Sequence, residues 1–328
     1  MPSPAEIALI DRWQRNFPLV ERPFAVVGQM AGLDEDTTIE TFHQLRETGV
    51  ISRIGAVVRP HTIGASTLAA MQVPPDRLDE VAAIVSREPL VSHNYERAHP
   101  INLWFVIAGP NAGAVATTIK NIEKQAGIPV LDLPLIQAYH LDLGFSLVGD
   151  RHQRRDMPPP AIDYCPDAID LKLLAAIEDG LPMVKHAYQE VASRLGIATE
   201  NMIDRLEHLI ASGIVTRFGC VVRHRALGYT ANAMAVWSVP DHIVDNVASR
   251  FVQHPQVTLC YRRPRRLPDW PYNLFCMIHA KARQDALAVI DDLNCVGETG
   301  LNDQTVLFST RCFKQRGAVF SSRTGGPH

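Results

Sequence analysis

Several features that would restrict the fold or the location of this protein are missing from its sequence. The 328 residues contain no apolar run close to the roughly 18 residues that a membrane-spanning helix needs. The six cysteines form no C-x-x-C pair, which disfavours a structural zinc site. Glu6 and Asp11 fall where a secretory signal peptide would be apolar. We therefore expect a cytoplasmic protein with no membrane partner and no resident metal ion.

The chain also has little net charge and few lysines. A formal charge of −3 gives no field that would draw the whole chain onto nucleic acid. Only 6 of the 32 basic residues are lysine, and the other 26 are arginine. One explanation is the base composition of the genome. The other is a requirement for planar guanidinium groups, which bind carboxylates through two parallel hydrogen bonds.

What the sequence does contain is an internal repeat. Residues 49–64 read GVISRIGAVVRPHTIG and residues 213–228 read GIVTRFGCVVRHRALG, with identical residues at seven aligned positions 164 residues apart. At roughly 100–200 residues per domain, the length alone suggests two domains or more. Because the offset of 164 is half of 328, the chain is predicted to consist of two copies of one larger unit.

Each copy of the repeat follows three helical segments. In the first half these are IALIDRWQ, FAVVGQMAGL and DEDTTIETFHQLRETG, and in the second half DLKLLAAIEDG, KHAYQEVASRLG and TENMIDRLEHLIASG. Apolar residues recur at helical spacing, and the last helix of each set stops at a glycine, Gly49 or Gly213. Three helices followed by a β-rich wing predict a winged helix-turn-helix domain over 1–60 and again over 167–224.

A second pattern follows each wing. In the first half the strand-like segments are LAAMQV, VSHNYER, NLWFVIAG and LPLIQAYHLDLGF, with helices predicted over 76–87 and 111–125. In the second half they are ANAMAVWSV, VTLCYRR, YNLFCMIHA and TVLFSTRCF, with helices predicted over 241–253 and 283–294. The order βαββαβ is typical of a ferredoxin-like domain.

Together the two patterns predict an α+β fold class, a tandem duplication of a winged helix-turn-helix domain followed by a ferredoxin-like domain. The ferredoxin-like copies are expected over 61–148 and 225–320. The proline-rich and charged segment over 149–166 suits a linker, and the tail over 321–328 is expected to be disordered.

One predicted strand carries an unusual set of side chains at alternate positions. His93, Tyr95, Arg97 and His99 have a period of two, so all four share a face if a single strand contains them. A face with two imidazoles, a phenol and a guanidinium is not an ordinary core. Histidine changes its charge near neutral pH, which suits it to proton transfer. The four residues are therefore candidates for a catalytic site.

The second half keeps only part of this set. Aligning its tyrosine, Tyr261, with the tyrosine of the first half places Leu259, Arg263 and Arg265 at the other three positions. The second half therefore has the tyrosine and an arginine but neither histidine. Either the first half carries the only competent site, or the chain has two unequal sites.

A winged helix-turn-helix followed by a βαββαβ domain resembles the Lrp/AsnC family of transcriptional regulators. The strings VSHNYERAHPINLWF and CYRRPRRLPDWPYNLFC resemble, more specifically, the signatures of the Lrp-like siroheme decarboxylases, in the fused two-subunit form of the haem d1 pathway. The resemblance extends over essentially all of the chain that is expected to be ordered.

The resemblance implies the removal of two acetate carboxyl groups from siroheme to give 12,18-didecarboxysiroheme. It implies no added cofactor, because the substrate carries its own iron. It also implies that the two halves pair as an intrachain pseudo-dimer, with a homo-oligomer or a second, dissimilar subunit pair as possible further partners. The expected small-molecule partner is siroheme or a related iron tetrapyrrole.

For such a substrate, the four residues at alternate positions acquire roles. His93 and His99 are interpreted as acids that protonate the substrate when carbon dioxide leaves. Tyr95 and Arg97 are interpreted as residues that orient the reacting carboxylate. An alternative role for one histidine is axial ligation of the siroheme iron.

The arginine excess supplies further candidates for binding a multiply carboxylated macrocycle. Residues six apart on a strand can share a face, which applies to the two arginines in each wing. The alternative is that wing arginines are ordinary surface residues and that strand aromatics are core. The candidates for substrate binding are Arg53 and Arg59 on the first wing, Arg217 and Arg223 on the second, and Tyr261, Arg263, Arg265 and Trp104 in the ferredoxin-like domains.

Two other functions compete with decarboxylation. A DNA-binding regulator needs basic or polar side chains on its third helix. The third helix of the first copy, over 34–48, has five acidic residues and one arginine. The third helix of the second copy, over 199–212, has three acidic residues and one arginine. These helices would repel phosphate, so no nucleic-acid partner is expected. The remaining alternative is a module that binds a tetrapyrrole without turnover.

Overall fold

The computed structural model divides into two compact units, and each unit draws on both halves of the sequence. One unit combines residues 1–63 with 146–227, and the other combines 64–145 with 228–322. No helix within the described residues is long and apolar enough to cross a membrane. The predicted tail and all but the last three residues of the predicted linker lie outside the described residues. The structure describes residues 2–60, 62–141, 144, 147, 164–296 and 303–317.

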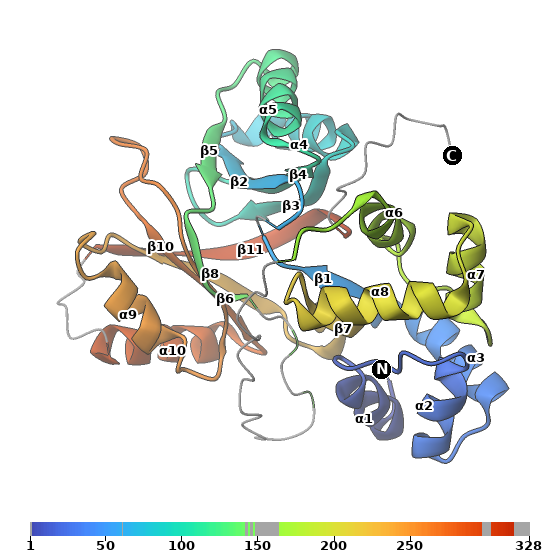
Figure 1. Ribbon diagram of the computed structural model, residues 1–328. Coiled ribbons are helices and arrows are strands. Elements are labelled where there is room, and N and C mark those ends of the chain that lie inside the picture. Colours follow the sequence, from blue (N-terminus) through green and yellow to red (C-terminus); the bar gives the residue numbers. More distant parts are fainter. Residues whose placement is uncertain are drawn as a thin grey trace. The chain divides into compact units, whose positions relative to one another are not determined.

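The first unit contains both helix-turn-helix copies, as the helical periodicity predicts (Figure 1). Gly49 and Gly213 follow the third helix of each copy with φ of 74° and 72°, a conformation in which glycine carries no Cβ penalty. The first copy comprises α1 (Pro4–Arg12), α2 (Pro23–Ala31), α3 (Glu35–Glu47) and β1 (Ile51–Val58), and the second α6 (Ala168–Ala176), α7 (Ala187–Leu195), α8 (Thr199–Ala211), β7 (Val215–Val222) and the short 3₁₀ helix η2 (His224–Leu227).

The two wings pair with each other. β1 runs antiparallel to β7, with Gly55 opposite Gly219, so each copy contributes one strand to a shared two-stranded ribbon. A Cβ on Gly219 would lie 2.4 Å from the carbonyl oxygen of Trp13, which is too close for any side chain. That carbonyl accepts a hydrogen bond of 2.7 Å from Cys220 N. Glycine therefore lets the end of α1 pack directly on the ribbon.

The second unit is built on a nine-stranded sheet with the order β5-β2-β4-β3-β11-β8-β10-β9-β6. The helices predicted from the sequence are all present, within a few residues of their expected bounds. The first copy comprises β2 (Ala65–Met71), η1 (Pro75–Arg77), α4 (Leu78–Arg87), β3 (Val91–Arg97), β4 (Leu103–Gly109), α5 (Ala112–Ala126), β5 (Leu131–Pro134) and β6 (Gln137–Leu141), and the second β8 (Ala231–Trp237), α9 (Val244–Phe251), β9 (Val257–Arg262), β10 (Leu274–Ala280), α10 (Arg283–Val296) and β11 (Gln304–Gln315).

The two ferredoxin-like copies exchange strands within this sheet. The segment LPLIQAYHLDLGF, predicted as one strand, forms two: β5 pairs with β2 of its own copy, whereas β6 pairs with β9 of the other copy. The last strand of the second copy, β11, lies between β3 and β8 and so joins the two halves of the sheet. The pairing expected between the halves therefore takes the form of one continuous sheet.

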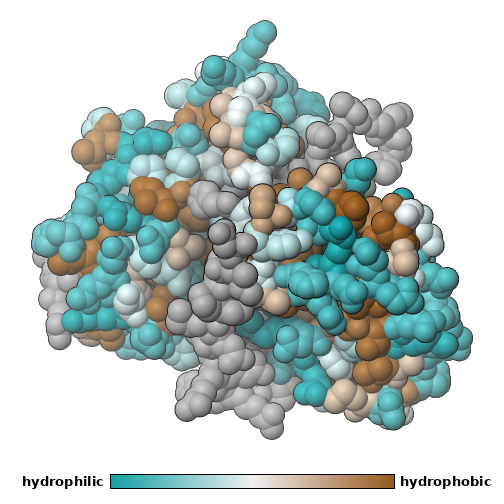
Figure 2. Space-filling model, viewed as in Figure 1, coloured by the Kyte–Doolittle hydropathy of each residue, from teal (hydrophilic) through white to brown (hydrophobic). Residues whose placement is uncertain are grey.

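The two faces of this sheet have different coverings. α4 and α5 pack on the strands of the first copy around residues such as Phe105 and Ile122, and α9 and α10 pack on those of the second around Phe251 and Leu293 (Figure 1). The opposite face, which we call the inner face, carries a third apolar cluster with residues from both copies, including Trp104. On the side of the molecule seen in Figure 2, apolar residues reach the surface in scattered patches between hydrophilic ones.

Candidate active site

Three residues of β3 project onto the inner face of the sheet. Asn94 points the other way, because its Nδ2 donates to the carbonyl of Ala82 in α4 at 3.0 Å. His93, Tyr95 and Arg97 alternate with it, as their spacing predicts. The rings of His93 and Tyr95 stack with centroids 6.2 Å apart, and Cζ of Arg97 lies 6.0 Å from the Tyr95 centroid. These three side chains form one continuous polar surface.

The fourth residue of the set, His99, is not part of that strand. β3 ends at Arg97, and the N–H of His99 donates to the Arg97 carbonyl at 2.8 Å in the turn that follows. The prediction that one strand places all four side chains on one face was therefore wrong for His99. Its Nδ1 accepts a hydrogen bond of 3.0 Å from Ile101 N, so the neutral ring carries its proton on Nε2. Burial lowers the pKa of His99.

His99 sits against aromatic and polar neighbours beside an open pocket. Its ring packs edge-on against Trp270, with centroids 5.7 Å apart. It lines the pocket together with Val73, Pro100 and Asn102. The imidazole is therefore reachable from solvent on one side, which an acid that protonates a bound substrate requires.

Arg97 is a buried cation whose hydrogen bonds go to neutral groups. Its side chain is 7% exposed, and Nη1 donates to the carbonyl of Leu307 at 3.0 Å while Nη2 lies 3.9 Å from Sδ of Met277. Within the described part of the chain, Nε has no hydrogen-bond partner. Burial lowers the pKa of Arg97 to about 10, so the guanidinium is still charged at neutral pH. A buried charge of this kind favours the arrival of an anion.

The structure adds a residue that the sequence analysis missed, His279 in β10. Arg97 lies opposite Ser309 across the β3–β11 pair, and Asn232 lies opposite His279 across the β8–β10 pair. The register of β11 on β8, with Phe308 opposite Ala233, places Ser309 and Asn232 in the same row. Residues paired directly across strands share a face. Four neighbouring strands therefore carry one polar row, Arg97, Ser309, Asn232 and His279, on the inner face.

The protonation of His279 follows from its neighbours. The hydroxyl of Thr258 donates to the carbonyl of Met277 at 3.0 Å, and its oxygen lies 2.9 Å from Nδ1 of His279. With its single proton already used, Thr258 accepts from Nδ1–H, which leaves Nε2 as the nitrogen with a lone pair. Burial, and secondarily the charge of Arg97, lowers the pKa of His279 to about 4. The ring is therefore neutral at neutral pH.

The signal that pointed to this residue was weak. His279 lies in the segment YNLFCMIHA, which is otherwise apolar and typical of a buried strand. Only the strand order shows that β10 lies near β3, with β11 and β8 between them.

The corresponding end of the second copy has a different chemistry. Cζ of Arg263 lies 4.6 Å from the Tyr261 centroid, and its Nη1 donates to the Leu133 carbonyl. Leu259 stands where the first copy has His93, and Ala108 occupies the place in β4 that His279 occupies in β10. Tyr261 and Arg263 are both largely buried, and burial lowers the pKa of Arg263. This end keeps a tyrosine and an arginine, but a leucine and an alanine stand at the places of His93 and His279.

Two sequence-predicted binding residues have other partners. Arg265 donates to Asp241 at 2.9 Å and also to the Val239 carbonyl, in the connection that follows β9. Trp104 is 1% exposed, donates from Nε1 to the Ile101 carbonyl at 2.7 Å and packs 5.0 Å from Trp270. The structure therefore places Arg265 in an ion pair and Trp104 in the inner-face core.

The four wing arginines all belong to the first unit. Arg53 lies on β1 and Arg217 on β7, and both are mostly buried. Arg59 and Arg223 follow the ends of these strands, where their N–H groups donate to the carbonyls of Ile214 at 2.8 Å and Val50 at 2.9 Å. The expected common strand face therefore does not include Arg59 and Arg223.

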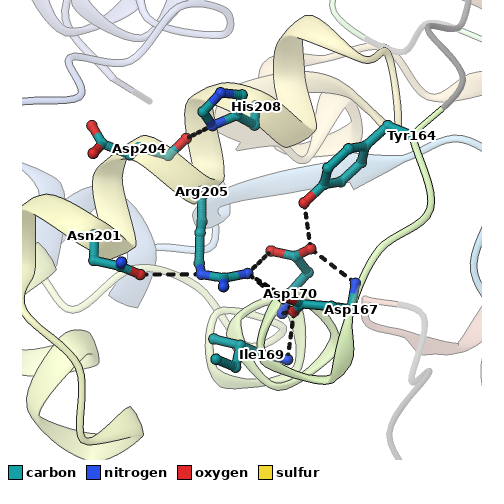
Figure 3. A network of polar contacts seen from close by, with 8 residues as sticks. All are labelled: Tyr164, Asp167, Ile169, Asp170, Asn201, Asp204, Arg205 and His208. Carbon is teal, nitrogen blue, oxygen red and sulfur yellow. Dashed lines mark hydrogen bonds and ion pairs between the residues drawn. The ribbon is translucent and has the colours of Figure 1, made fainter.

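The third helices of the first unit use their polar groups internally. In α8, Nη1 of Arg205 binds Asp167 and Asp170, each at 2.9 Å, and Asp170 also accepts from the Tyr164 hydroxyl at 2.6 Å (Figure 3). Asp170 is completely buried. The single arginine of α8, the third helix of the second copy, is thus bound to two carboxylates at the start of α6.

In α3, polar groups contact the other helix-turn-helix copy. Asp36 pairs with Lys185 at 2.8 Å, and Nε2 of His43 lies 3.0 Å from the carbonyl of Met183. A helix that reads a DNA groove would instead present these groups outward.

The described residues contain no group of three or more His, Cys, Asp or Glu side chains arranged to hold a metal ion. All six cysteines lie within the described ranges, and all six are free thiols. Cys220, Cys260 and Cys276 are buried, and the other three are exposed.

Comparison with known proteins gives the same domain pattern. The family described as the siroheme decarboxylase NirDL-like HTH domain matches residues 6–51 and 170–215. The AsnC-like ligand binding domain matches residues 63–140 and 226–314.

Similar proteins cover either the whole chain or one half of it. The siroheme decarboxylase NirDL subunit of Paracoccus denitrificans is 41% identical over 96% of this chain and 97% of its own length. The siroheme decarboxylase NirD subunit of Stutzerimonas stutzeri is 43% identical over 43% of this chain and 93% of its own length. A crystal structure of the siroheme decarboxylase NirDL in co-complex with an iron-uroporphyrin III analogue is 27% identical, with a TM-score of 0.68 over 96% of this chain and 95% of that one. The chain therefore belongs to the siroheme decarboxylase NirDL family.

Proposed function

We propose that this chain removes two acetate carboxyl groups from siroheme and releases 12,18-didecarboxysiroheme. Relatives that match the whole chain are named as siroheme decarboxylases, and the similar solved structure holds an iron-uroporphyrin III analogue. The observation that carries the proposal is the polar row on the inner face, where a buried Arg97 lies beside Tyr95 and His93 from one copy and near His279 from the other.

Binding of the reacting carboxylate is the first task of this site. Arg97 is charged and buried, and its described hydrogen bonds go to a carbonyl and a thioether rather than to a carboxylate. A carboxylate from the substrate would supply the missing opposite charge. Hydrogen bonds to charged groups contribute on the order of 1.5–3 kcal/mol each. Tyr95, next to Arg97, has a hydroxyl that would donate to the second carboxylate oxygen and fix its orientation.

The reaction then needs a place for an electron pair and a source of a proton. When the bond between the acetate CH2 and its carboxylate breaks, carbon dioxide leaves and the bonding pair remains on the macrocycle side. Protonation of the adjoining pyrrole-type ring prepares it to accept that pair. Addition of one proton to the former CH2 yields the methyl group, and the ring then gives up the proton that it had accepted, so each acetate consumes one proton in total and releases one CO2.

His93 and His99 are the proposed proton donors. His93 is partly buried, lies on the inner face and contacts Tyr95, and His99 lines an accessible pocket. A positioned general acid typically contributes about 10²–10⁴-fold to the rate. His279 has a different role, because burial keeps its ring neutral and it is therefore not a source of the proton.

The reaction requires no added cofactor in this scheme, because the substrate carries its own iron. Tyr261 and Arg263 of the second copy serve binding or pairing rather than proton transfer, because Leu259 and Ala108 replace the counterparts of His93 and His279. Relatives such as the NirD subunit match one half of the chain, which supports pairing of two such halves within this chain. A homo-oligomer or a second, dissimilar subunit pair remains a further partner to test.

Two rival functions make different predictions. A transcriptional regulator is disfavoured by Arg205, which is bound by Asp167 and Asp170, and by the contacts of α3 with the other helix-turn-helix copy. A tetrapyrrole-binding module without turnover would use Arg97 in the same way but would return the substrate unchanged.

Mass analysis of the tetrapyrrole tests the proposal. The purified chain is incubated anaerobically with siroheme, and the molecular mass of the extracted pigment is measured by mass spectrometry. Loss of two CO2 supports decarboxylation of both acetates. Recovery of unchanged siroheme from a complex that forms normally would contradict the proposed activity and support the binding module.

A further inference from the structure

The first unit contains a buried arginine, and none of the groups that act on it in the described part of the chain is a carboxylate. Arg217 lies on β7 opposite Val57 and is 7% exposed. Its Nη1 has no hydrogen-bond partner among the residues that the structure describes. Burial, together with the positive charges of Arg15 and Arg53, lowers the pKa of Arg217 to about 10. The guanidinium is charged at neutral pH, yet no carboxylate of the described chain acts on it.

The duplication supplies a matched comparison for this residue. Arg53 occupies the same position of the first copy, 164 residues earlier, on the adjacent strand β1. Burial lowers the pKa of Arg53 as well, but Asp179 and Glu178 act in the opposite direction and favour its charge. The two arginines of the ribbon therefore have the same backbone position and different electrostatic surroundings.

The difference comes from the turn that follows the first helix of each copy. Asp179 and Glu178 follow α6, and the residues 164 positions earlier, after α1, are Arg15 and Gln14. The turn that supplies two carboxylates near Arg53 supplies an amide and a second cation near Arg217. A carboxylate is thus replaced by a guanidinium at the same place in the fold.

The two turns take a similar course. Asn16 and Gly180 occupy equivalent positions and both have positive φ, 51° and 115°. The following residues also meet the ribbon alike, since Phe17 N donates to the Phe218 carbonyl at 3.1 Å and Leu181 N donates to the Ile54 carbonyl at 2.7 Å. Charge, and not backbone geometry, distinguishes the two ends of the ribbon.

We propose that Arg217, with Arg15 beside it, forms a binding site for a carboxylate. A buried ion without an opposite charge is costly, and a planar guanidinium favours a carboxylate through paired hydrogen bonds. Arg15 is only partly buried, which gives an anion a route from the surface. Asp11, one turn earlier, accepts hydrogen bonds from Gln14 Nε2 at 3.0 Å and Leu147 N at 2.7 Å and is not among the groups that act on Arg217.

This site goes beyond the proposed decarboxylation, because it lies in the first unit and is argued without reference to the polar row. Its ligand is a carboxylate from one of two sources: a side chain of the tetrapyrrole, or a free small carboxylate. The two sources share the chemistry that recognises them and differ in the experiments below.

Thermal unfolding of the full chain provides the first test. Unfolding is followed in sodium acetate and in sodium chloride at equal pH and ionic strength, for the wild type and for Arg217→Met. Acetate at roughly ten times its Kd is expected to raise the Tm of the wild type by about 3 °C relative to chloride, and to leave Arg217→Met unchanged. The same acetate effect in both proteins would overturn the proposal.

Two further variants control for simple damage to the fold. Arg15→Asp places a carboxylate after α1, at the position equivalent to Asp179 after α6. It is therefore expected to raise the Tm in chloride and to remove the response to acetate. Arg53→Met removes the buried cation whose charge Asp179 and Glu178 favour, so it is expected to lower the Tm. In chloride, Arg217→Met is expected to lose much less than Arg53→Met. Equal losses in these two variants, together with no gain from Arg15→Asp, would count against a carboxylate site at Arg217.

Titration with siroheme distinguishes the two sources. If the carboxylate belongs to the tetrapyrrole, Arg217→Met weakens siroheme binding at least tenfold, and saturating siroheme removes the acetate effect. If it is a free carboxylate, siroheme binding is unchanged and the acetate effect persists with siroheme bound. Release of CO2 is measured on the same samples. The unfolding results do not depend on turnover, so a chain without decarboxylase activity would leave the anion site supported, and a failed anion site would leave the activity untouched.

Discussion

Nδ1 of His279 lies 2.9 Å from Oγ1 of Thr258, whose own proton goes to the Met277 carbonyl. This contact fixes the tautomer of an imidazole that belongs to the second copy and lies in one row with Arg97 of the first. Because β11 joins the two copies into one sheet, neither copy alone contains the whole row. The fused chain therefore builds its candidate site from side chains that are about 180 residues apart in sequence.

The first prediction concerns stability in mild acid. Burial lowers the pKa of His279 to about 4, whereas in the unfolded chain it has its ordinary value near ~6.5. Between these values the unfolded chain binds more protons, so the free energy of unfolding decreases as the pH falls through this range, by up to about 3 kcal/mol from this residue. In His279→Gln this decrease should be smaller, as measured by urea unfolding at pH 7 and pH 5.

A matched control for this measurement is His242→Gln, because His242 is exposed and lies in the same copy. It should keep the pH dependence of the wild type. If His279→Gln and His242→Gln show the same dependence, His279 is not buried in the neutral form.

Much of the fold was predictable because its signals are local. Helical periodicity and the glycines after α3 and α8 identified both helix-turn-helix copies, and alternation identified the strands. Strand exchange was not predictable, because nothing in the alternation of β6 or β11 records which copy it pairs with. The same applies to the site. The period of two identified His93, Tyr95 and Arg97, but an apolar segment concealed His279 until the strand order was known.

Burial was the other property that the sequence did not reveal. The repeat identified Arg53 and Arg217 as equivalent, but it did not indicate that they are buried. Their burial results from the turns after α1 and α6, which pack on the ribbon through contacts such as Trp13 with Cys220. Contacts of this kind join elements far apart in sequence and leave no periodic pattern.

The second prediction concerns the proposed acids. His93→Ala and His99→Ala should each lower the rate of CO2 release by about 10²–10⁴-fold while leaving siroheme affinity largely intact, because each removes a proton donor rather than a charge that holds the substrate. The measurements are single-turnover CO2 release and an absorption titration. Full activity in both variants would exclude this assignment.

The pH profile adds a separate readout for His99. Burial lowers its pKa, so its protonated fraction declines already below the usual value near ~6.5. If His99 donates the proton, the single-turnover rate of the wild type should fall as the pH rises through that lowered pKa. This limb of the profile should be missing from the residual activity of His99→Ala. An unchanged limb would assign it to another group.

The third prediction concerns Arg97. Arg97→Lys keeps a positive charge but loses the planar group that donates to Leu307 and reaches Met277. Because lysine does not bind a carboxylate through paired hydrogen bonds, siroheme affinity should fall about 10–100-fold. Arg87→Lys, at the exposed end of α4, is the control and should bind as the wild type does. Equal affinity for both variants would remove Arg97 from the binding site.

The fourth prediction concerns DNA. The third helices use Arg205 and Asp36 within the first unit, so they should present little attraction to phosphate. A random duplex at 50 mM salt should show no shift at protein concentrations up to about 100 µM, where ordinary non-specific DNA binders are bound. A shift that weakens steeply with added salt would instead support the regulator.

The last prediction decides whether one end of the sheet or both ends perform the reaction. The second copy has Leu259 where the first has His93, so His93→Leu makes the two ends alike at this position. If the end with His93, Tyr95, Arg97 and His279 performs both decarboxylations, His93→Leu should return siroheme with neither carboxyl group removed. If each end removes one carboxyl group, the same variant should accumulate a product that has lost a single CO2. Mass analysis of the pigment separates these outcomes, and the replacement of the His93 counterpart by Leu259 leads us to expect the first.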